Sequence, residues 1–242
     1  MSSHRFAVPG VSPHSLLYTP RRGVSFLRAY NPPVPTSIQL RFRDLRRRFG
    51  RLRVLDGVSG ATGSGEVLVV TGANGSGKST LLRCLAGLLA PDSGEVEHRE
   101  EGGEPLAAAE RRLRVGYVAP DLALYEELTA IENLDFFARL RRVPAVRGGE
   151  LLDHLSLPHG RRAGALSSGM RQKLRWAWAL LHRPRLLLLD EPFQNLDATG
   201  EAAVRDLLAE HLAAGGAAVL AQPVDVSIPD DWKVAEHVQL AG

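Results

Sequence analysis

The stretch TGANGSGKST, residues 71–80, decides the fold of this chain. It follows an apolar run at residues 67–70 and precedes leucines at helical spacing, so a strand, a glycine-rich turn and a helix are predicted in succession. Gly72, Gly75 and Gly77 let the backbone fold tightly, so that successive N–H groups can face one anion. The helix that follows adds the partial positive charge of its N-terminus. We therefore predict that residues 71–80 bind phosphate, and we call them the phosphate loop.

Two side chains of the phosphate loop extend this prediction to a nucleotide. Lys78 is placed to reach β- and γ-phosphate oxygens. The hydroxyl of Ser79 is placed to ligate Mg²⁺. A glycine-rich turn that merely caps a helix seldom carries both groups at this spacing.

Length and composition indicate a soluble globular protein. The chain has 242 residues, which suits one α/β domain or one domain with a small subdomain. Hydrophobic residues make up 44% and charged residues 24%. Because no apolar run approaches the roughly 18 residues of a membrane span, we expect any spans to come from another chain. The single cysteine, Cys84, suits a reducing cytosol and a buried apolar position.

The N-terminal part is basic and proline-rich. Residues 1–53 hold eleven arginines and one acid, Asp44, although the net charge of the whole chain is only +3. Such a cluster can attract anionic lipid or nucleic acid, but a solvated tail is the more frequent case, and no nucleic acid is expected. Residues 1–36 contain six prolines and no acid, so we predict an irregular or disordered extension. The folded domain is predicted to cover residues 37–242.

The remainder of the chain alternates strand and helix patterns. The predicted strands lie at residues 38–43, 52–55, 67–70, 95–98, 113–118, 186–189 and 217–221. The predicted helices lie at residues 81–88, 129–141, 150–157, 169–182 and 199–213, the second of them starting at a Thr129–Glu132 capping box. This alternation predicts a mainly parallel sheet with helices on both faces. Residues 120–182 form a predicted helical insertion.

A second motif, LLLLDEP at residues 186–192, places two carboxylates after a buried strand. The carboxyl ends of parallel strands are where such sheets bind ligands. Asp190 is therefore predicted to hold Mg²⁺, directly or through water. Glu191 is predicted to orient or deprotonate an attacking water.

A third motif, LSSGM at residues 166–170, precedes a predicted helix. Ser168 is the predicted N-cap of this helix. Serine hydroxyls and free N–H groups at a helix N-terminus can also form a second anion site. A further carboxylate, Asp197, follows in the run QNLD.

Taken together, TGANGSGKST, LSSGM, LLLLDEP and NLD, in this order and spacing, resemble the nucleotide-binding subunit of ATP-binding cassette (ABC) transporters over residues 37–242. The resemblance implies an α/β fold: a P-loop NTPase core with a mainly parallel sheet, an antiparallel β-subdomain and an α-helical signature subdomain. The residues that it implies for ATP are Gly72, Ala73, Asn74, Gly75, Ser76, Gly77, Lys78, Ser79, Thr80 and Phe49. Phe49 would stack on adenine, and its alternative role is in the core at a strand end.

The resemblance also implies partners. In this family two ATPase subunits, identical or different, pair head to tail with ATP between them. The residues that would contact the partner's nucleotide are Ser167, Ser168, Gly169 and Met170, while Asp197 would lie at the dimer contact. An integral membrane permease would be the second partner, with the chain on the cytoplasmic face of the membrane. The passages VGYVAPDLALYEELTAIENL and LSSGMRQKLRWAWALL are similar to the haem-exporter-type branch.

The sequence departs from the family pattern at two places. The family expects a glutamine after the strand at 113–118, and Pro120 stands there. It also expects a histidine after the strand at 217–221, where Gln222 and a proline follow. Asp121 and Gln222 are possible surrogates, although aspartate is shorter than glutamine and glutamine cannot become cationic. Each lost γ-phosphate contact lowers transition-state stabilisation, so hydrolysis is predicted to be slow.

Three functions follow from the sequence. The first is a peripheral ATPase subunit that powers a separate permease through ATP-driven dimer closure. The second is a nucleotide-gated clamp with weak or no hydrolysis. The third is a soluble ABC ATPase without a role in transport, but such proteins usually carry two cassettes or a coiled-coil insertion, and this chain shows no heptads or internal repeats.

Overall fold

The computed structural model describes residues 37–100, 102–223, 228–229 and 232–240. The irregular extension predicted for residues 1–36 lies outside this range. The strands are β1 (Ile38–Phe49), β2 (Leu52–Gly63), β3 (Val67–Thr71), β4 (Ser93–Glu100), β5 (Val115–Val118), β6 (Leu186–Asp190), β7 (Ala217–Gln222) and β8 (Val234–Gln239). The helices are α1 (Lys78–Leu85), α2 (Ala108–Arg114), α3 (Ala130–Arg141), α4 (Val146–His154), α5 (Ser168–Leu180), α6 (Ala198–Ala213) and the short 3₁₀ helix η1 (Ala163–Ala165).

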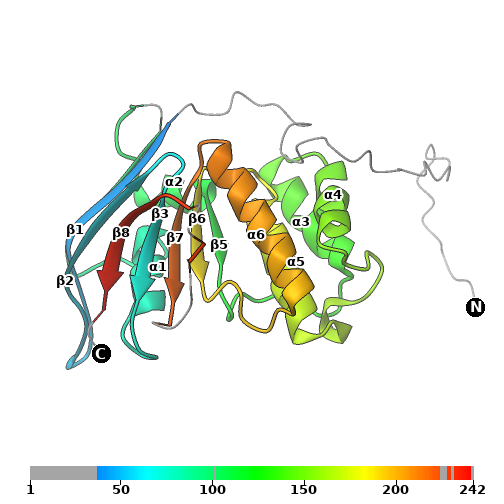
Figure 1. Cartoon of the computed structure of the whole chain (residues 1–242), viewed down its shortest axis with the longest axis horizontal. Coiled ribbons are helices and arrows are strands. Elements are labelled where there is room, and N and C mark those ends of the chain that lie inside the picture. Colours follow the sequence, from blue (N-terminus) through cyan, green and yellow to red (C-terminus); the bar gives the residue numbers. More distant parts are fainter. Residues whose placement is uncertain (1–36, 101, 224–227, 230–231, 241–242) are drawn as a thin grey trace, which may run out of the picture.

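A five-stranded sheet with the order β5-β6-β7-β3-β8 forms the centre of the molecule (Figure 1). Each pair of neighbouring strands in it is parallel. The predicted parallel sheet is therefore confirmed. Because β3 and β6 each run parallel to β7, which lies between them, their carboxyl ends open on the same edge. The chain thus brings the phosphate loop and the two carboxylates after β6 to one side of the sheet.

The sheet separates two hydrophobic cores. Along β6, Leu187 and Leu189 pack into the core that faces α3–α6, while Leu186 and Leu188 pack into the core that contains α1 and β1. All four leucines are fully buried. Burial of one leucine stabilises a fold by about 1.5–3 kcal/mol, so the continuous apolar run on this strand is explained by cover on both faces.

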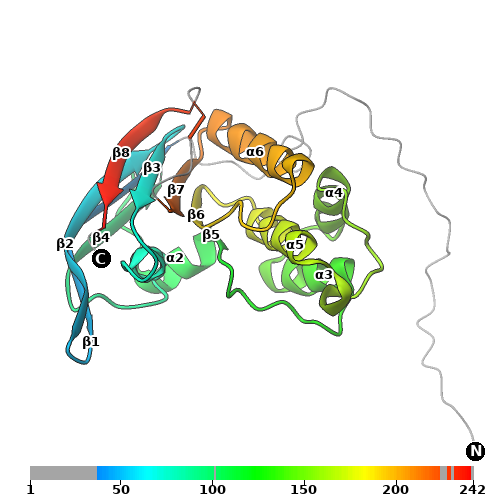
Figure 2. The ribbon, with the colours of Figure 1, turned by 60° about the horizontal axis from the view of Figure 1, so that its bottom comes forward.

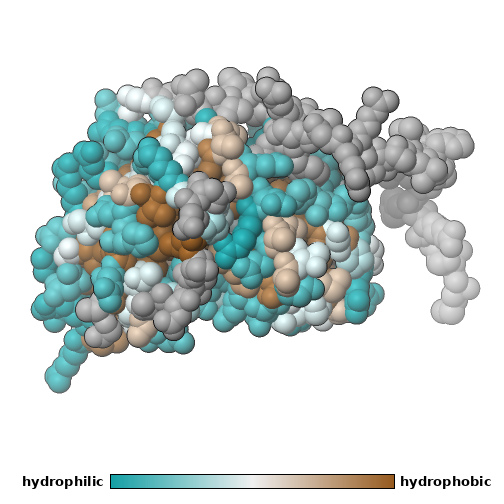
Figure 3. All heavy atoms as spheres, viewed as in Figure 1, coloured by the Kyte–Doolittle hydropathy of each residue, from teal (hydrophilic) through white to brown (hydrophobic). Residues whose placement is uncertain are grey.

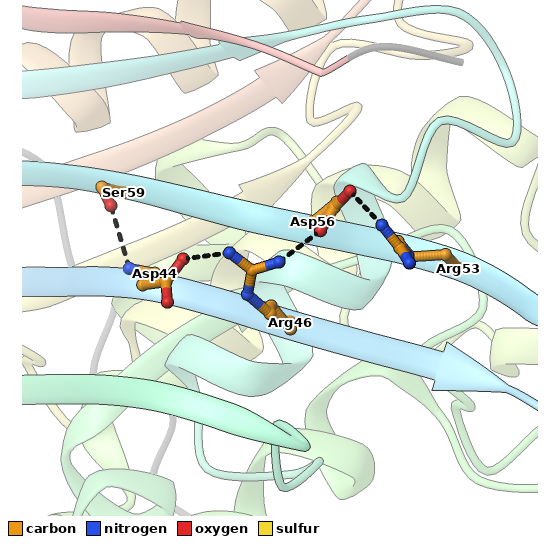
Figure 4. Close-up of polar contacts among 5 residues, drawn as sticks. All are labelled: Asp44, Arg46, Arg53, Asp56 and Ser59. Carbon is orange, nitrogen blue, oxygen red and sulfur yellow. Dashed lines mark hydrogen bonds and ion pairs between the residues drawn. The ribbon is translucent and has the colours of Figure 1, made fainter.

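A second, antiparallel sheet has the order β2-β1-β4 and confirms the predicted antiparallel subdomain. Figure 4 shows a polar chain on its long hairpin, in which Arg46 bonds Asp44 at 2.8 Å and Asp56 at 2.7 Å. Arg53 also bonds Asp56, and the N–H of Asp44 donates to the Ser59 hydroxyl. These groups are exposed, so each contact adds little stability, but together they tie β1 to β2 near the turn.

Helices α3, α4 and α5 gather at the opposite end of the molecule from β1 and β2 (Figure 2). Helix α3 begins as predicted, because Thr129 Oγ1 accepts a hydrogen bond from the N–H of Glu132 at 3.3 Å and the Glu132 carboxylate accepts one from the N–H of Thr129 at 2.8 Å. No described helix has both the length and the apolar content that a bilayer crossing requires. The face shown in Figure 3 is mostly hydrophilic, with hydrophobic residues grouped near its centre.

Several predicted elements have different bounds in the structure. The strand predicted at 113–118 starts only at Val115, because its pairing with β6 begins there, and Leu113 belongs to the unpredicted helix α2. The strand predicted at 52–55 continues to Gly63, since it pairs with β1 along its whole length. The helix predicted at 150–157 spans Val146–His154, where Gly148 allows a close approach to α3. Strand β8 was not predicted.

Candidate functional site

The phosphate loop adopts a backbone that only glycine allows without strain. Gly75 has φ 85° and Gly77 has φ 100°, both in the left-handed region. A Cβ on Gly77 would lie 2.8 Å from the carbonyl oxygen of Val54, so a side chain is excluded there by space as well. Gly77 also serves as the N-cap of α1, which directs the helix N-terminus at the loop.

The polar side chains of the loop are held ready for an anion. Lys78 is only 5% exposed, and its Nζ donates to the carbonyl oxygens of Gly72 at 2.8 Å and Ala73 at 3.0 Å. The buried hydroxyl of Ser76 has no hydrogen-bond partner among the described residues. Because buried polar atoms are normally bonded, this hydroxyl fits a loop that closes on a ligand.

Ser79 and Asp190 lie side by side at the start of α1 and the end of β6. Their side chains share a hydrogen bond, which favours the charged carboxylate, while burial raises the pKa of Asp190 and is the larger effect. No group of three or more metal-ligating His, Cys, Asp or Glu side chains occurs in the described part of the chain. Mg²⁺ needs no such cage, since it is usually held by one or two protein oxygens together with phosphates and water. A hydroxyl and a carboxylate therefore fit a magnesium ion.

Glu191 follows in a strained turn, residues 190–192, which we call the acidic turn. Its φ is 45°, a left-handed conformation that costs a non-glycine residue about 1–3 kcal/mol and persists only when neighbours fix it. The N–H of Glu191 donates to the carbonyl of Ala221 on β7 at 2.9 Å. The amide of Gln194 donates to the Glu191 carboxylate at 3.1 Å. The carboxylate is thus fixed in direction beside the phosphate loop.

A cavity of about 400 Å³ joins these groups. It is lined by Phe49, Val54, Asn74, Gly75, Gly77, Lys78, Ser79, Thr80 and Glu191. Phe49 is 49% exposed, so its alternative role in a strand-end core is wrong. The guanidinium of Arg47 lies 5.0 Å from the centre of the Phe49 ring. The structure therefore brings the aromatic side chain, the lysine and the predicted base to one cavity.

The segment at residues 166–170 forms a separate hollow. The N-cap of α5 is Ser167, whose hydroxyl accepts a hydrogen bond from the N–H of Met170 at 3.2 Å, so the predicted cap at Ser168 is wrong. Ser168 is the first helical residue because the serine with extended backbone lies one position earlier. A hollow of about 180 Å³ is lined by Ser167, Ser168, Gly169, Met170, Lys173, Asn195, Leu196 and Asp197.

This hollow is built by close backbone contact. A Cβ on Gly169 would lie 2.5 Å from the carbonyl oxygen of Asn195, so only glycine fits there. The Asp197 carboxylate caps α6 by accepting a hydrogen bond from the N–H of Gly200 at 2.7 Å. The hollow and the cavity at the phosphate loop share no lining residue. Within one chain, the two predicted anion sites are thus separate.

Comparison with known protein families gives a match over residues 55–194, more than half of the chain, to the family described as ABC transporter. This chain belongs to the ABC transporter family. Its parallel sheet, antiparallel sheet and helices form the ATP-binding domain fold of that family.

Individual relatives support the assignment to the ABC family. A sulfate/thiosulfate import ATP-binding protein CysA from Bradyrhizobium diazoefficiens is 43% identical over 167 residues, which cover 64% of this chain and 48% of the relative. A cytochrome c biogenesis ATP-binding export protein CcmA from Cupriavidus necator is 41% identical over 180 residues, which cover 72% of this chain and 78% of the relative. A solved ATP-binding subunit of an ABC transporter has a TM-score of 0.67 at 28% identity, over 76% of this chain and 79% of that one.

These relatives differ in the direction of the transport that their names give and in chain length. The ABC chain spans about half the length of the CysA relative, and the named functions include both import and export. CcmA is the export protein among these relatives, and the haem-exporter-type branch stays a prediction for this chain.

The two possible surrogates in the ABC chain lie in different surroundings. Asp121 forms an ion pair with Arg83 of α1 and lines another cavity, of about 420 Å³, that does not include the phosphate loop. Gln222 is 2% exposed at the end of β7 and lines a cavity of about 330 Å³ together with Glu191. Only Gln222 is therefore brought near the predicted base.

Sequence reasoning missed two residues of α5 that hold the acidic turn of the ABC chain. Gln172 Nε2 donates to the carbonyl of Pro192 at 3.0 Å, and the indole N–H of Trp176 donates to the same oxygen at 3.0 Å. Both side chains are buried. The available signal was Gln172 itself, at helical spacing before the apolar Trp176 and Ala179, because a buried amide requires a partner.

Proposed function

We propose that this chain is the ATP-binding and ATP-hydrolysing subunit of an ABC transporter, and that ATP-driven closure of a dimer powers a separate membrane permease. The observation that carries the proposal is the single cavity shared by Lys78, Ser79 and Glu191, with Phe49 at its rim. A lysine, a hydroxyl and a carboxylate around one phosphate-sized space are the groups that phosphoryl transfer to water requires.

In this proposal the phosphate loop binds the triphosphate and Phe49 stacks on the adenine. Successive N–H groups of Gly72 to Thr80 surround the β-phosphate, and Lys78 transfers its hydrogen bonds from loop carbonyls to phosphate oxygens. The side chains of Ser79 and Asp190 would hold Mg²⁺, which neutralises phosphate charge when bound. Glu191, directed by Gln194, accepts a proton from the attacking water.

The second half of the site comes from a partner subunit, identical or different. Ser167 and Gly169 lie in a hollow that is separate from the cavity of their own chain. A second copy turned head to tail can place this hollow against the γ-phosphate, with Met170 and Asp197 at the contact. The N-terminus of α5 then adds its positive end to the bound anion. The permease docks this dimer to the cytoplasmic face of the membrane.

A nucleotide-gated clamp is the second candidate. It is favoured by one observation, the pairing of Asp121 with Arg83, because this carboxylate is held by α1 instead of facing the phosphate loop. With Pro120 at the expected glutamine position, the chain has no amide side chain there for the attacking water. Binding and closure would persist while hydrolysis is slow.

The test compares ATP turnover of the full chain with that of Glu191→Gln. The charge-matched control is Glu127→Gln, because Glu127 is exposed and does not line the cavity. The ATPase proposal expects turnover to fall by about 100-fold or more in Glu191→Gln and to stay unchanged in the control. Glu191→Gln should also form an ATP-dependent dimer in light scattering. Equal turnover in all three proteins, with dimers still forming, supports the clamp. Absence of ATP binding overturns both.

A further inference from the structure

The position of Glu191 depends on its turn, and the turn is held from α5. Gln172 Nε2 donates to the carbonyl oxygens of Pro192 at 3.0 Å and Glu191 at 3.4 Å. These bonds fix the two peptide groups that follow the left-handed Glu191, one on each side of Pro192. The Gln172 amide therefore contributes to holding the turn that carries the Glu191 carboxylate.

Arg175, one turn further along α5, fixes the Gln172 amide. Its Nη1 donates to Gln172 Oε1 at 3.2 Å, which leaves the Gln172 Nε2 facing the acidic turn. Its Nε donates to the carbonyl of Leu122 at 3.1 Å. The planar guanidinium thus bonds two acceptors at once, which an ammonium on a flexible stem does with less geometric control.

Leu122 belongs to the loop after β5, residues 119–122. On its other side this loop is bound to α1, the helix that starts at the phosphate loop, through the ion pair of Asp121 with Arg83. The loop therefore lies between α1, which follows the phosphate loop, and α5, which begins within residues 166–170. Pro120 supplies no side-chain amide, so the connection from this loop to the acidic turn runs through a backbone carbonyl and Arg175.

We propose that Arg175 is a positioning residue that couples the loop at residues 119–122 to Glu191 through Gln172. The proposal rests on the proposed ATPase function for its effect on turnover. When the loop shifts, Arg175 moves with it and the Gln172 amide turns. The acidic turn then changes conformation, and the Glu191 carboxylate points either toward the phosphate loop or away from it. Arg175 itself does not touch the cavity at the phosphate loop.

The surroundings agree with this arrangement. Arg175 is partly buried beside Arg171, and burial followed by the nearby Arg171 charge lowers the pKa of Arg175. Arg171 is one helical turn before Arg175 on the same face, and its side chain makes no hydrogen bond to the acidic turn or to Gln172 among the contacts of the described residues. The chain therefore offers a control with the same charge, helix and neighbourhood.

The test measures turnover and ATP affinity of the full chain in Arg175→Met, Arg175→Lys and Arg171→Met. We expect kcat to fall about tenfold in Arg175→Met with an unchanged ATP Kd, because only the direction of the base is altered. Arg175→Lys should recover little, and Arg171→Met should stay within about twofold of the unaltered chain. Full activity in Arg175→Lys would show that only the positive charge at this position matters for turnover, and would overturn the proposed coupling through the guanidinium.

A double-variant cycle tests whether Arg175 acts through Gln172 or independently of it. If Arg175 acts through Gln172, then Arg175→Met combined with Gln172→Leu should be no slower than Gln172→Leu alone. Effects that multiply would show independent roles and overturn the proposal.

A readout without turnover keeps the proposal testable if the chain hydrolyses ATP poorly. The Trp176 indole N–H bonds the Pro192 carbonyl, so its NMR resonance and hydrogen exchange report on the acidic turn. The chain has three tryptophans, and Trp176→Phe identifies the signal. Arg175→Met should shift this resonance and speed its exchange, whereas Arg171→Met should not. An unchanged resonance in Arg175→Met would overturn the proposed coupling through Arg175. If the resonance shifts but turnover does not depend on Glu191, only the hydrolytic part of the proposed function is contradicted.

Discussion

The Nζ of Lys78 lies 2.8 Å from the carbonyl oxygen of Gly72, so the lysine folds back over the loop that carries it. A second bond to the Ala73 carbonyl, at 3.0 Å, completes this arrangement. The ammonium group is thereby kept at the centre of the loop with its charge buried. A phosphate oxygen is a charged acceptor, so it forms a stronger hydrogen bond with an ammonium group than a neutral carbonyl oxygen does.

Lys78→Ala should weaken ATP binding by about 100-fold, because charge-assisted bonds to phosphate are lost. Isothermal titration with ATP and Mg²⁺ measures the loss. Lys233→Ala is the control, since the Lys233 side chain is 72% exposed and forms an ion pair with Glu66. Equal ATP affinity in the two variants would contradict the assigned role of Lys78.

Phe49→Ala should weaken ATP binding by about tenfold, as stacking on a base contributes about 1–3 kcal/mol. Inorganic triphosphate should bind the variant as well as it binds the unaltered chain, because it has no base. Leu52→Ala is the matched control, for Leu52 pairs with Phe49 across the hairpin turn and is 66% exposed. A similar loss in Leu52→Ala would point to the hairpin and not to stacking.

Gly169→Ala should lower stability by about 1–3 kcal/mol, since the new Cβ would meet the Asn195 carbonyl at 2.5 Å. ATP-dependent dimers of Glu191→Gln should be lost when this change is added. Thermal unfolding and light scattering measure the two effects. Gly160→Ala should have neither, because no heavy atom lies within 4 Å of a Cβ at that position.

Gln222→Ala should lower ATP turnover by about tenfold, because Gln222 shares a cavity with Glu191. Asp121→Asn should lower turnover by less than Gln222→Ala, because Asp121 lines a different cavity and can act only by holding the loop at residues 119–122 to Arg83. Steady-state kinetics of both variants decide which residue assists the reaction. A larger loss in Asp121→Asn would reverse the assignment.

Stability should rise with pH between about 4 and 6.5 through His211. Burial lowers the pKa of His211 in the folded chain from 6.5 to about 4, while its Nε2–H donates to the Ala217 carbonyl at 3.1 Å. In this window the unfolded chain binds a proton that the folded chain does not, so acid favours unfolding by up to about 3 kcal/mol. Above pH 6.5 the contribution is constant. Urea unfolding across pH 4.5–7.5 should show a weaker pH dependence for His211→Gln, and identical curves would contradict this assignment.

The elements that the sequence predicts well are those with strong local signals. The capping box at Thr129 and the apolar run of β6 depend on residues close in the chain, and both are found as predicted. Strand β8 is stabilised by pairing with β3, far earlier in the sequence, and its own alternation is weak. The start of β5 likewise depends on where β6 offers hydrogen bonds.

The same distinction applies to the site. Lys78 and Ser79 could be found because phosphate binding requires these groups at a fixed spacing in the loop, and Glu191 because it directly follows a buried apolar strand. The partners of Gln172 and Arg175 could not be found, since Glu191, Pro192 and Leu122 lie 19 to 53 positions away from them and only the packed structure brings these groups together. The N-cap of α5 was wrongly predicted at Ser168 instead of Ser167, because two adjacent serines present the same signal for a cap.

The alternation of leucines along β6 gives the molecule two halves that can be altered separately. Leu187 contributes to the side on which α5 carries residues 166–170, and Leu188 to the side on which α1 follows the phosphate loop. Substitutions at Leu187 or Leu189 therefore disturb the core beneath α5, whereas substitutions at Leu186 or Leu188 disturb the core beneath α1. One strand thus lets the two sides of the sheet be repacked separately, through alternate positions along it.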